Sequence, residues 1–189
     1  MYYRPLETAV VTVEQRKRVA LLVEDEFEDA DVAGTSDLLR SAGVEVVMVG
    51  PLAGRTYRGR KSLEIEAQMS AGKAHAKDFD AVLIPGGYAP DRMRMRHAMT
   101  DLVRDMLAAG KPVAAIDRGA QLLISVKAVA GRMITCWPSI AIDIKNAGGR
   151  YVDRPVVEDG CVITARKADD VPHFAAAILK ALGHLQPVA

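Results

Sequence analysis

The sequence predicts an α/β protein with a doubly wound, mostly parallel sheet and helices on both faces. Two observations carry this prediction. Between residues 18 and 182, short β-branched apolar runs alternate with longer stretches of helical period, which is the order expected of βαβ units. Most of these runs are apolar throughout instead of alternating with polar residues, which indicates strands buried on both faces of a parallel sheet.

The first half of the chain supplies three such strands, one helix and one irregular segment. The strands are expected at residues 19–23, 44–49 and 80–84. Residues 28–42 have helical period and Gly43 ends that helix, since glycine readily takes the left-handed conformation after a last turn. Residues 56–69 predict one or two short antiparallel strands, because polar and apolar residues alternate at 63–67.

The second half continues the alternation and ends on a helix. Strands are expected at residues 113–116 and 132–136 and in a hairpin over 156–164. Helices are expected at residues 91–109, 120–129, 139–147 and 169–182. The hairpin turns at Asp159-Gly160, a dipeptide typical of two-residue β-turns. We therefore expect one domain over residues 18–185, preceded by an extension at 1–17. Within that extension, residues 9–13 form either an added strand or arm, or part of a loosely ordered tail.

Composition excludes several function classes. The 189 residues are 50% hydrophobic and carry 25 Lys+Arg against 24 Asp+Glu, so we expect no nucleic-acid partner and no anionic membrane partner. A chain of this length buries roughly 70% of its unfolded surface, so its core needs neither disulfides nor a metal. With two cysteines, no secretory leader pattern and no apolar run near ~20 residues, we expect a cytoplasmic protein.

The chemistry is expected just after the strands. In an open α/β sheet, ligands bind at the carboxyl ends of the strands, which here are followed by residues 24–29, 85–91, 117–119 and 136–139. A phosphoacceptor receiver domain is disfavoured because the strand ending at Ile84 continues into Pro85-Gly86-Gly87 without a carboxylate. A dinucleotide fold is disfavoured because no G-x-G-x-x-G follows the first strand.

The strongest local signal is the junction at Asp117. A buried strand, residues 113–116, passes into a helix through Asp117-Arg118-Gly119. One polar residue between a strand and a helix, followed closely by glycine, is typical of a nucleophile elbow, in which the polar side chain projects at the sheet edge among backbone N–H groups. An ordinary helix N-cap at Asp117 is the alternative. An elbow requires a sparsely populated backbone conformation at Asp117, and an N-cap does not.

Several segments in order then resemble the ThiJ/PfpI family of intracellular proteases and deglycases. The segments that carry this resemblance are Glu26-Phe-Glu-Asp29, Asp80-Ala-Val-Leu-Ile-Pro-Gly-Gly87 with Ala89-Pro-Asp91, Gly110-Lys-Pro-Val-Ala-Ala-Ile116, Asn146-Ala-Gly148 and Thr164-Ala-Arg166. The resemblance implies a flavodoxin-like sheet, as in class I glutamine amidotransferases. It also implies that Glu28 is the acid beside the nucleophile, that Gly87 supplies an oxyanion-type N–H, and that Asp91 lies at the rim of the site.

The chain departs from this family at the elbow itself. The family's A-I-C-H-G is Ala115-Ile-Asp-Arg-Gly119 here, so the thiol nucleophile and the histidine after it are absent. Trp137 stands where relatives often carry His or Tyr. Cys136 as a displaced nucleophile is disfavoured, because its strand-end position faces away from the neighbouring site position, and Cys161 lies in a valine-rich strand. Thiol-dependent chemistry therefore does not carry over to this chain.

Two functions remain open. In the first, the protein is an enzyme in which Asp117 and Glu28 form a carboxylate pair beside Arg118, suited to hydrolysis, hydration or isomerisation of a small molecule. In the second, the protein is a non-catalytic or stress-related member of the family, and it binds a ligand in the pocket around the elbow. Two carboxyls that lie close together lose their protons in two steps at separate pH values. We expect a short contact between the two carboxyls with the proton on Glu28, because the helix N-terminus stabilises the charge of Asp117.

The remaining expectations concern binding and assembly. Substrate or oxyanion contacts are assigned to five residues. These are Gly86, Gly87, Asp91, Gly119 and Trp137. No metal and no cofactor is expected. The resemblance implies a homodimer or a higher homo-oligomer, with the methionine-rich helix after Asp91 as an apolar contact surface.

Overall fold

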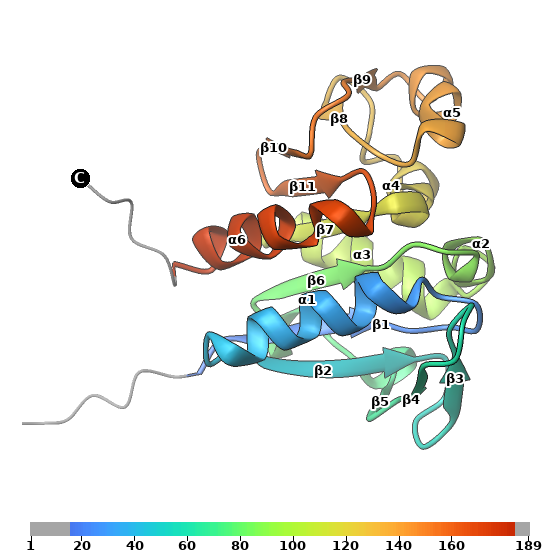
Figure 1. Cartoon of the computed structure of the whole chain (residues 1–189), viewed down its shortest axis with the longest axis vertical. Helices are drawn as coiled ribbons and strands as arrows, with labels where there is room; N and C mark the ends of the chain where they lie inside the picture. Colours follow the sequence, from blue (N-terminus) through green and yellow to red (C-terminus); the bar gives the residue numbers. More distant parts are fainter. Residues whose placement is uncertain (1–15, 184–189) are drawn as a thin grey trace, which may run out of the picture.

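The computed structural model describes residues 16–183 and shows one large sheet with helices on both sides (Figure 1). The strands of this sheet are β1 (Arg18–Leu22), β2 (Glu45–Gly50), β5 (Met69–Ser70), β6 (Ala81–Ile84), β7 (Val113–Ile116), β10 (Val156–Asp159) and β11 (Val162–Ala165). Their order is β10-β11-β7-β6-β1-β2-β5. All neighbours pair in parallel except β10 and β11, which form the expected antiparallel hairpin. The predicted fold class is confirmed.

The helices cover this sheet unequally. Helices α1 (Asp29–Ser41) and α6 (Val171–Ala181) pack against each other on one face, and α3 (His97–Ala108) packs against β6 and β7 from the other (Figure 1). The shorter helices are α2 (Ala89–Met93), α4 (Ala120–Ser125) and α5 (Ala141–Asn146). Strands β1, β6 and β7 are buried along almost their whole length, because helices or loops cover both sides of the sheet. Burying each large apolar side chain stabilises the fold by about 1.5–3 kcal/mol.

The strand order creates a crevice at the carboxyl ends of β1 and β6. From β1 the chain builds outward through β2 to β5 and then returns to place β6 and β7 on the other side of β1. The strand order reverses between β1 and β6, and the loops that follow these two strands leave the sheet in opposite directions. Ligands of open α/β sheets bind at such a switch point. The two loops touch, because the Glu28 N–H donates to the Gly86 carbonyl oxygen at 3.2 Å.

Three elements differ from their sequence-based expectations. The helix expected at residues 91–109 is two helices, because Arg96 leaves the helical conformation (φ −107°, ψ 102°); there its Nε lies 3.5 Å from the buried Glu24 carboxylate. The helix expected at 120–129 ends at Ser125. The strand expected at 132–136 shortens to β8 (Met133–Ile134) and pairs with β9 (Arg150–Tyr151) outside the main sheet.

The segment expected to hold short antiparallel strands forms a hairpin of β3 (Thr56–Arg58) and β4 (Glu64–Glu66) beside the end of β2. Single-turn 3₁₀ helices complete the chain. They are η1 (Ala71–Lys73), η2 (Ala76–Asp78), η3 (Asp117–Gly119), η4 (Pro138–Ile140) and η5 (Ala168–Asp170).

Parts of the expected domain organisation lie outside the described residues. The strand or tail at 9–13 and the domain end at 184–185 belong to these parts, so the boundaries 1–17 and 18–185 stay predictions. Between residues 16 and 183, no helix combines the length and apolar character needed to cross a bilayer. Of the methionines after Asp91, Met93, Met99 and Met106 are fully buried in the core and Met95 is exposed, so the three buried ones do not form the predicted contact surface.

Candidate active site

Asp117 stands at a strained junction between β7 and α4. Its φ is +58°, a left-handed conformation that Asp and Asn tolerate better than most side chains. This confirms the sparsely populated backbone predicted for an elbow, and it leaves the plain N-cap interpretation without support. The Asp117 carbonyl oxygen accepts the Trp137 N–H at 3.1 Å, so the junction also fixes the start of the segment that carries Trp137.

Glycines make room for the Asp117 side chain. A Cβ on Gly86 would overlap the Asp117 carboxylate, and a Cβ on Gly119 would lie 2.5 Å from the Ile84 carbonyl oxygen. The Gly87 N–H donates to Oδ2 of Asp117 at 2.8 Å. The expected oxyanion donor at Gly87 is therefore engaged by Asp117 itself, and Gly119 serves the close packing of the turn.

A second carboxyl, that of Asp31, lies buried beneath Asp117. Its Oδ2 accepts the Gly86 N–H at 3.0 Å, while its Oδ1 is buried with no hydrogen-bond partner among the described residues. Burial raises the pKa of Asp31 to about 8, and the negative charge of Asp117 adds to the shift. Burial therefore favours the protonated form of Asp31 at neutral pH.

Asp31 is the main site residue that sequence reasoning missed. A signal was available, because Asp31 follows Glu28 by three residues and shares the inward helix face with Val32 and Thr35. An acid at such a position is seldom fully buried without a special reason.

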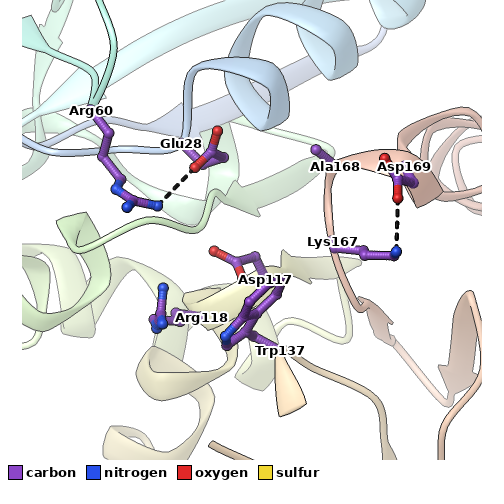
Figure 2. A pocket seen from close by; sticks show the side chains of 8 residues that line it. All are labelled: Glu28, Arg60, Asp117, Arg118, Trp137, Lys167, Ala168 and Asp169. Atoms are coloured by element: carbon purple, nitrogen blue, oxygen red, sulfur yellow. Dashed lines mark hydrogen bonds and ion pairs between the residues drawn. The ribbon is translucent and has the colours of Figure 1, made fainter. Parts of the chain in front are cut away.

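Glu28 does not touch Asp117 through a hydrogen bond. Its Oε2 instead pairs with Arg60 Nη1 at 3.1 Å, and Figure 2 shows this pair across the pocket from Asp117. Burial raises the pKa of Asp117, backbone N–H groups and the Arg118 charge oppose that rise, and the charge of Glu28 adds to it. The two carboxylates thus interact through space, and the shared short hydrogen bond with its proton on Glu28 is not formed.

Arg60 reaches the pocket because Asp29 organises the β3–β4 turn. The Asp29 carboxylate accepts the backbone N–H groups of Lys61, Ser62 and Leu63 at 3.0, 3.0 and 2.8 Å. Burial works against ionisation of Asp29, but these donors outweigh it and lower the pKa of Asp29 below its usual value. Arg60 was also missed from the sequence, since its hairpin is distant from every predicted site segment.

Aromatic rings hold the Arg118 side chain. Its Cζ lies 5.2 Å from the ring centre of Tyr88 and 5.5 Å from that of Trp137, distances typical of cation–π contacts. Arg60 approaches the same Tyr88 ring at 5.0 Å. The structure therefore brings Arg118 and Trp137 to Asp117, as predicted, and adds Tyr88.

These groups surround a pocket of about 330 Å³ at the carboxyl end of the sheet, near the lower limit for small-molecule sites. Its lining residues are Glu28, Arg60, Asp117, Arg118, Trp137, Lys167, Ala168 and Asp169. The Lys167 ammonium pairs with Asp169 at 2.7 Å (Figure 2). Asp91 does not line the pocket; it lies exposed on α2.

The cysteines lie outside this lining. Cys136 is fully buried, and burial together with the charges of Asp117 and Asp143 raises the pKa of its thiol to about 12. A thiol of this kind is protonated at neutral pH and is a poor nucleophile. Cys161 lies half-buried at the turn between β10 and β11 and packs against the core.

The class that fold and site define together is a doubly wound α/β protein with a strand-to-helix elbow at the switch point of its sheet. The model of the DJ-1/PfpI family matches residues 17–181, and the chain belongs to this family.

Named relatives cover the same region. The chain is 40% identical over 169 residues to protein/nucleic acid deglycase 2 of Escherichia coli, covering 88% of this chain and 98% of that protein. It is 35% identical to general stress protein 18 of Bacillus subtilis, covering 84% and 93%. A two-domain protein of Anabaena variabilis with DJ-1/ThiJ/PfpI-like and ferritin-like domains superposes with a TM-score of 0.87 at 36% identity; the match covers 92% of this chain and 52% of that protein.

Proposed function

We propose that this family member is an enzyme that replaces thiol chemistry with acid–base catalysis by Asp117 and Glu28. The reaction class is hydrolysis, hydration or dehydration, or isomerisation of a small molecule. The observation that carries the proposal is the position of Asp117: a strained, buried carboxylate that lines a pocket, with the buried Asp31 close to it. A residue that has merely replaced a lost nucleophile would be expected to drift to Ala, Ser or Gly, because a carboxylate here costs stability.

The roles of the residues follow from their surroundings. Asp117 acts as the base, since burial raises its proton affinity above that of an ordinary aspartate. Glu28 faces it across the pocket and exchanges a proton with the substrate on the other side, with Arg60 holding the Glu28 carboxylate in place. Arg118 supplies a fixed positive charge beside the reacting groups.

A panel of small esters, amides, unsaturated acids and hydroxycarbonyl compounds tests the proposal in deuterated water. Hydration or isomerisation that moves a proton to carbon leaves carbon-bound deuterium in the product, and hydrolysis gives new acid and alcohol or amine signals; NMR detects both. We expect Asp117→Asn to reduce turnover by at least about a hundredfold, Glu28→Gln to reduce it less, and Cys136→Ser with Cys161→Ser to change it only a few-fold. Turnover that survives Asp117→Asn would refute the proposal.

The second candidate is a non-catalytic, ligand-binding or stress-related protein. Two observations favour it: the Gly87 N–H is occupied by Asp117, and the Glu28 carboxylate is occupied by Arg60. A ligand that binds in the pocket without deuterium exchange or product, across the same panel, would support this candidate over the enzyme.

A further inference from the structure

Arg118 differs from the other cations of the pocket. Arg60 and Lys167 each form an ion pair with a carboxylate, at 3.1 and 2.7 Å. Arg118 forms neither an ion pair nor a side-chain hydrogen bond with any residue between 16 and 183; it makes cation–π contacts with the rings of Tyr88 and Trp137, and its charge acts on the neighbouring Asp117. Within the described part of the chain, the N–H groups of the Arg118 side chain are therefore free to donate to a ligand or to solvent.

The contacts of Arg118 leave its N–H groups available. Its Cζ lies over the rings of Tyr88 and Trp137, and its side-chain N–H groups, which lie in the plane of the guanidinium, donate to no acceptor among residues 16–183. A planar edge with parallel N–H donors matches the two oxygens of a carboxylate in a bidentate pair. Lysine in the same place would offer a point charge without this match.

The charges of the lining limit the charge of the ligand. Three cations (Arg60, Arg118 and Lys167) face three carboxylates (Glu28, Asp117 and Asp169), so the empty lining is formally neutral. Arg60 already pairs with Glu28 and Lys167 with Asp169, so Arg118 is the lining cation that can pair with one bound carboxylate, which brings the lining from a net charge of 0 to −1. A dianion such as a phosphate would bring a second charge close to Glu28 and Asp117, which disfavour it by repulsion.

We propose that the pocket binds a small molecule bearing one carboxylate, which Arg118 holds by its guanidinium edge while the rest of the molecule lies over Asp117. This inference names the substrate class of the proposed function, and it rests on that function in one respect: the bound molecule is a substrate only if the protein is an enzyme. Binding itself is measured without turnover, so the two proposals fail separately.

The experiment compares acids with their neutral amides by isothermal titration and ligand-observed NMR. The probes are acetate, 2-oxobutanoate and crotonate, each beside its amide, with inorganic phosphate, measured at about pH 8 where it is mainly the dianion. We expect at least one acid to bind about tenfold or more tightly than its amide and than phosphate. Arg118→Met is expected to remove this preference and Arg118→Lys to restore part of it. Arg104→Met, on the exposed surface of α3, serves as the matched control and is expected to leave binding unchanged.

Three outcomes overturn the inference: no acid binds to the wild-type protein at millimolar concentration, the amides bind as well as the acids, or Arg118→Met binds the acids normally. The Asp117→Asn variant separates the two proposals. It is expected to bind the acid at least as tightly as the wild type, because a neighbouring negative charge is gone, while losing turnover. Retained turnover with Arg118-dependent binding would refute only the acid–base function, and Asp117-dependent turnover of neutral compounds alone would refute only the carboxylate class.

Discussion

Asp117 and Asp31 are held by consecutive backbone N–H groups, those of Gly87 and Gly86, so one short loop fixes both carboxyls. The two differ in what surrounds them. Asp117 faces the pocket and lies beside Arg118, whereas Asp31 is enclosed by the protein. This difference separates a carboxyl that can exchange protons with a ligand from one that retains its proton.

Replacing Asp31 by Asn is expected to change the pH dependence of stability. A carboxyl whose pKa is raised on folding stabilises the fold most below its unfolded pKa, near 4, and this contribution is lost as pH rises through the folded pKa, which is about 8 for Asp31. The wild type should therefore lose up to about 1.4 kcal/mol per pH unit over this window relative to Asp31→Asn. Urea denaturation at several pH values measures this.

The exposed Asp37, on the same helix, provides the control for that experiment. Asp37→Asn is expected to leave the profile parallel to that of the wild type. If Asp31→Asn also gave a parallel profile, Asp31 would be ionised in the folded protein.

Replacing Asp117 by Asn should abolish turnover and stabilise the fold. Asn tolerates the left-handed φ of this position and removes the charge that burial disfavours. Because the pKa of Asp117 is raised on folding, the gain in unfolding free energy should be small near pH 4 and grow as the pH rises above it. Equal stability of variant and wild type between about pH 5 and 8 would contradict the buried-charge argument and favour a non-catalytic site.

The sequence revealed the site residues that follow the strands directly and missed those that come from segments distant in the chain. Asp117, Arg118 and Gly86 follow buried strands directly, so their place at the sheet edge could be predicted from the pattern of the strands. Arg60 comes from a hairpin whose docking depends on Asp29 and three backbone donors, which no local pattern indicates.

The sequence analysis placed the proton of the site on Glu28 and missed Asp31, for a different physical reason. The raised pKa of Asp31 depends on its burial, which follows from the packing of α1 against the sheet and is not determined by helical period alone. The same holds for the break at Arg96, which accompanies the approach of that side chain to a buried glutamate distant in sequence.

Replacing Asp29 by Asn should loosen the β3–β4 turn and displace Arg60. Three N–H groups would lose a charged acceptor, and we expect a loss of about 1–2 kcal/mol of unfolding free energy. Since the pKa of Asp29 is lowered on folding, the wild type's advantage should be present above about pH 4 and vanish as the pH falls below it. Hydrogen exchange of the Lys61, Ser62 and Leu63 amides reports the loosening. Unchanged protection of these amides would show that the turn is held by other contacts.

The thiols are expected to be dispensable. Burial raises the pKa of the Cys136 thiol to about 12, so it should react with a disulfide reagent at about pH 8 only after unfolding. The Cys136→Ser, Cys161→Ser protein should keep any activity within a few-fold of the wild type. Inactivation by alkylation of Cys136 alone would restore a thiol mechanism.

Self-association remains a prediction from family membership. We expect static light scattering at micromolar concentration to give at least a dimer. The buried methionines of α3 do not supply the contact surface. If the protein is a dimer, Met95→Lys tests whether the exposed Met95 lies in the contact between the subunits. A homogeneous monomer would contradict the prediction.

The stacking of Trp137 on Arg118 also gives the molecule an optical reporter. The sequence contains one tryptophan, and its indole lines the pocket against a guanidinium. Excitation of the indole therefore samples this one environment, without a background from other tryptophans. A molecule that draws Arg118 away from the ring, or shields the ring from water, should shift the colour and intensity of the emitted light.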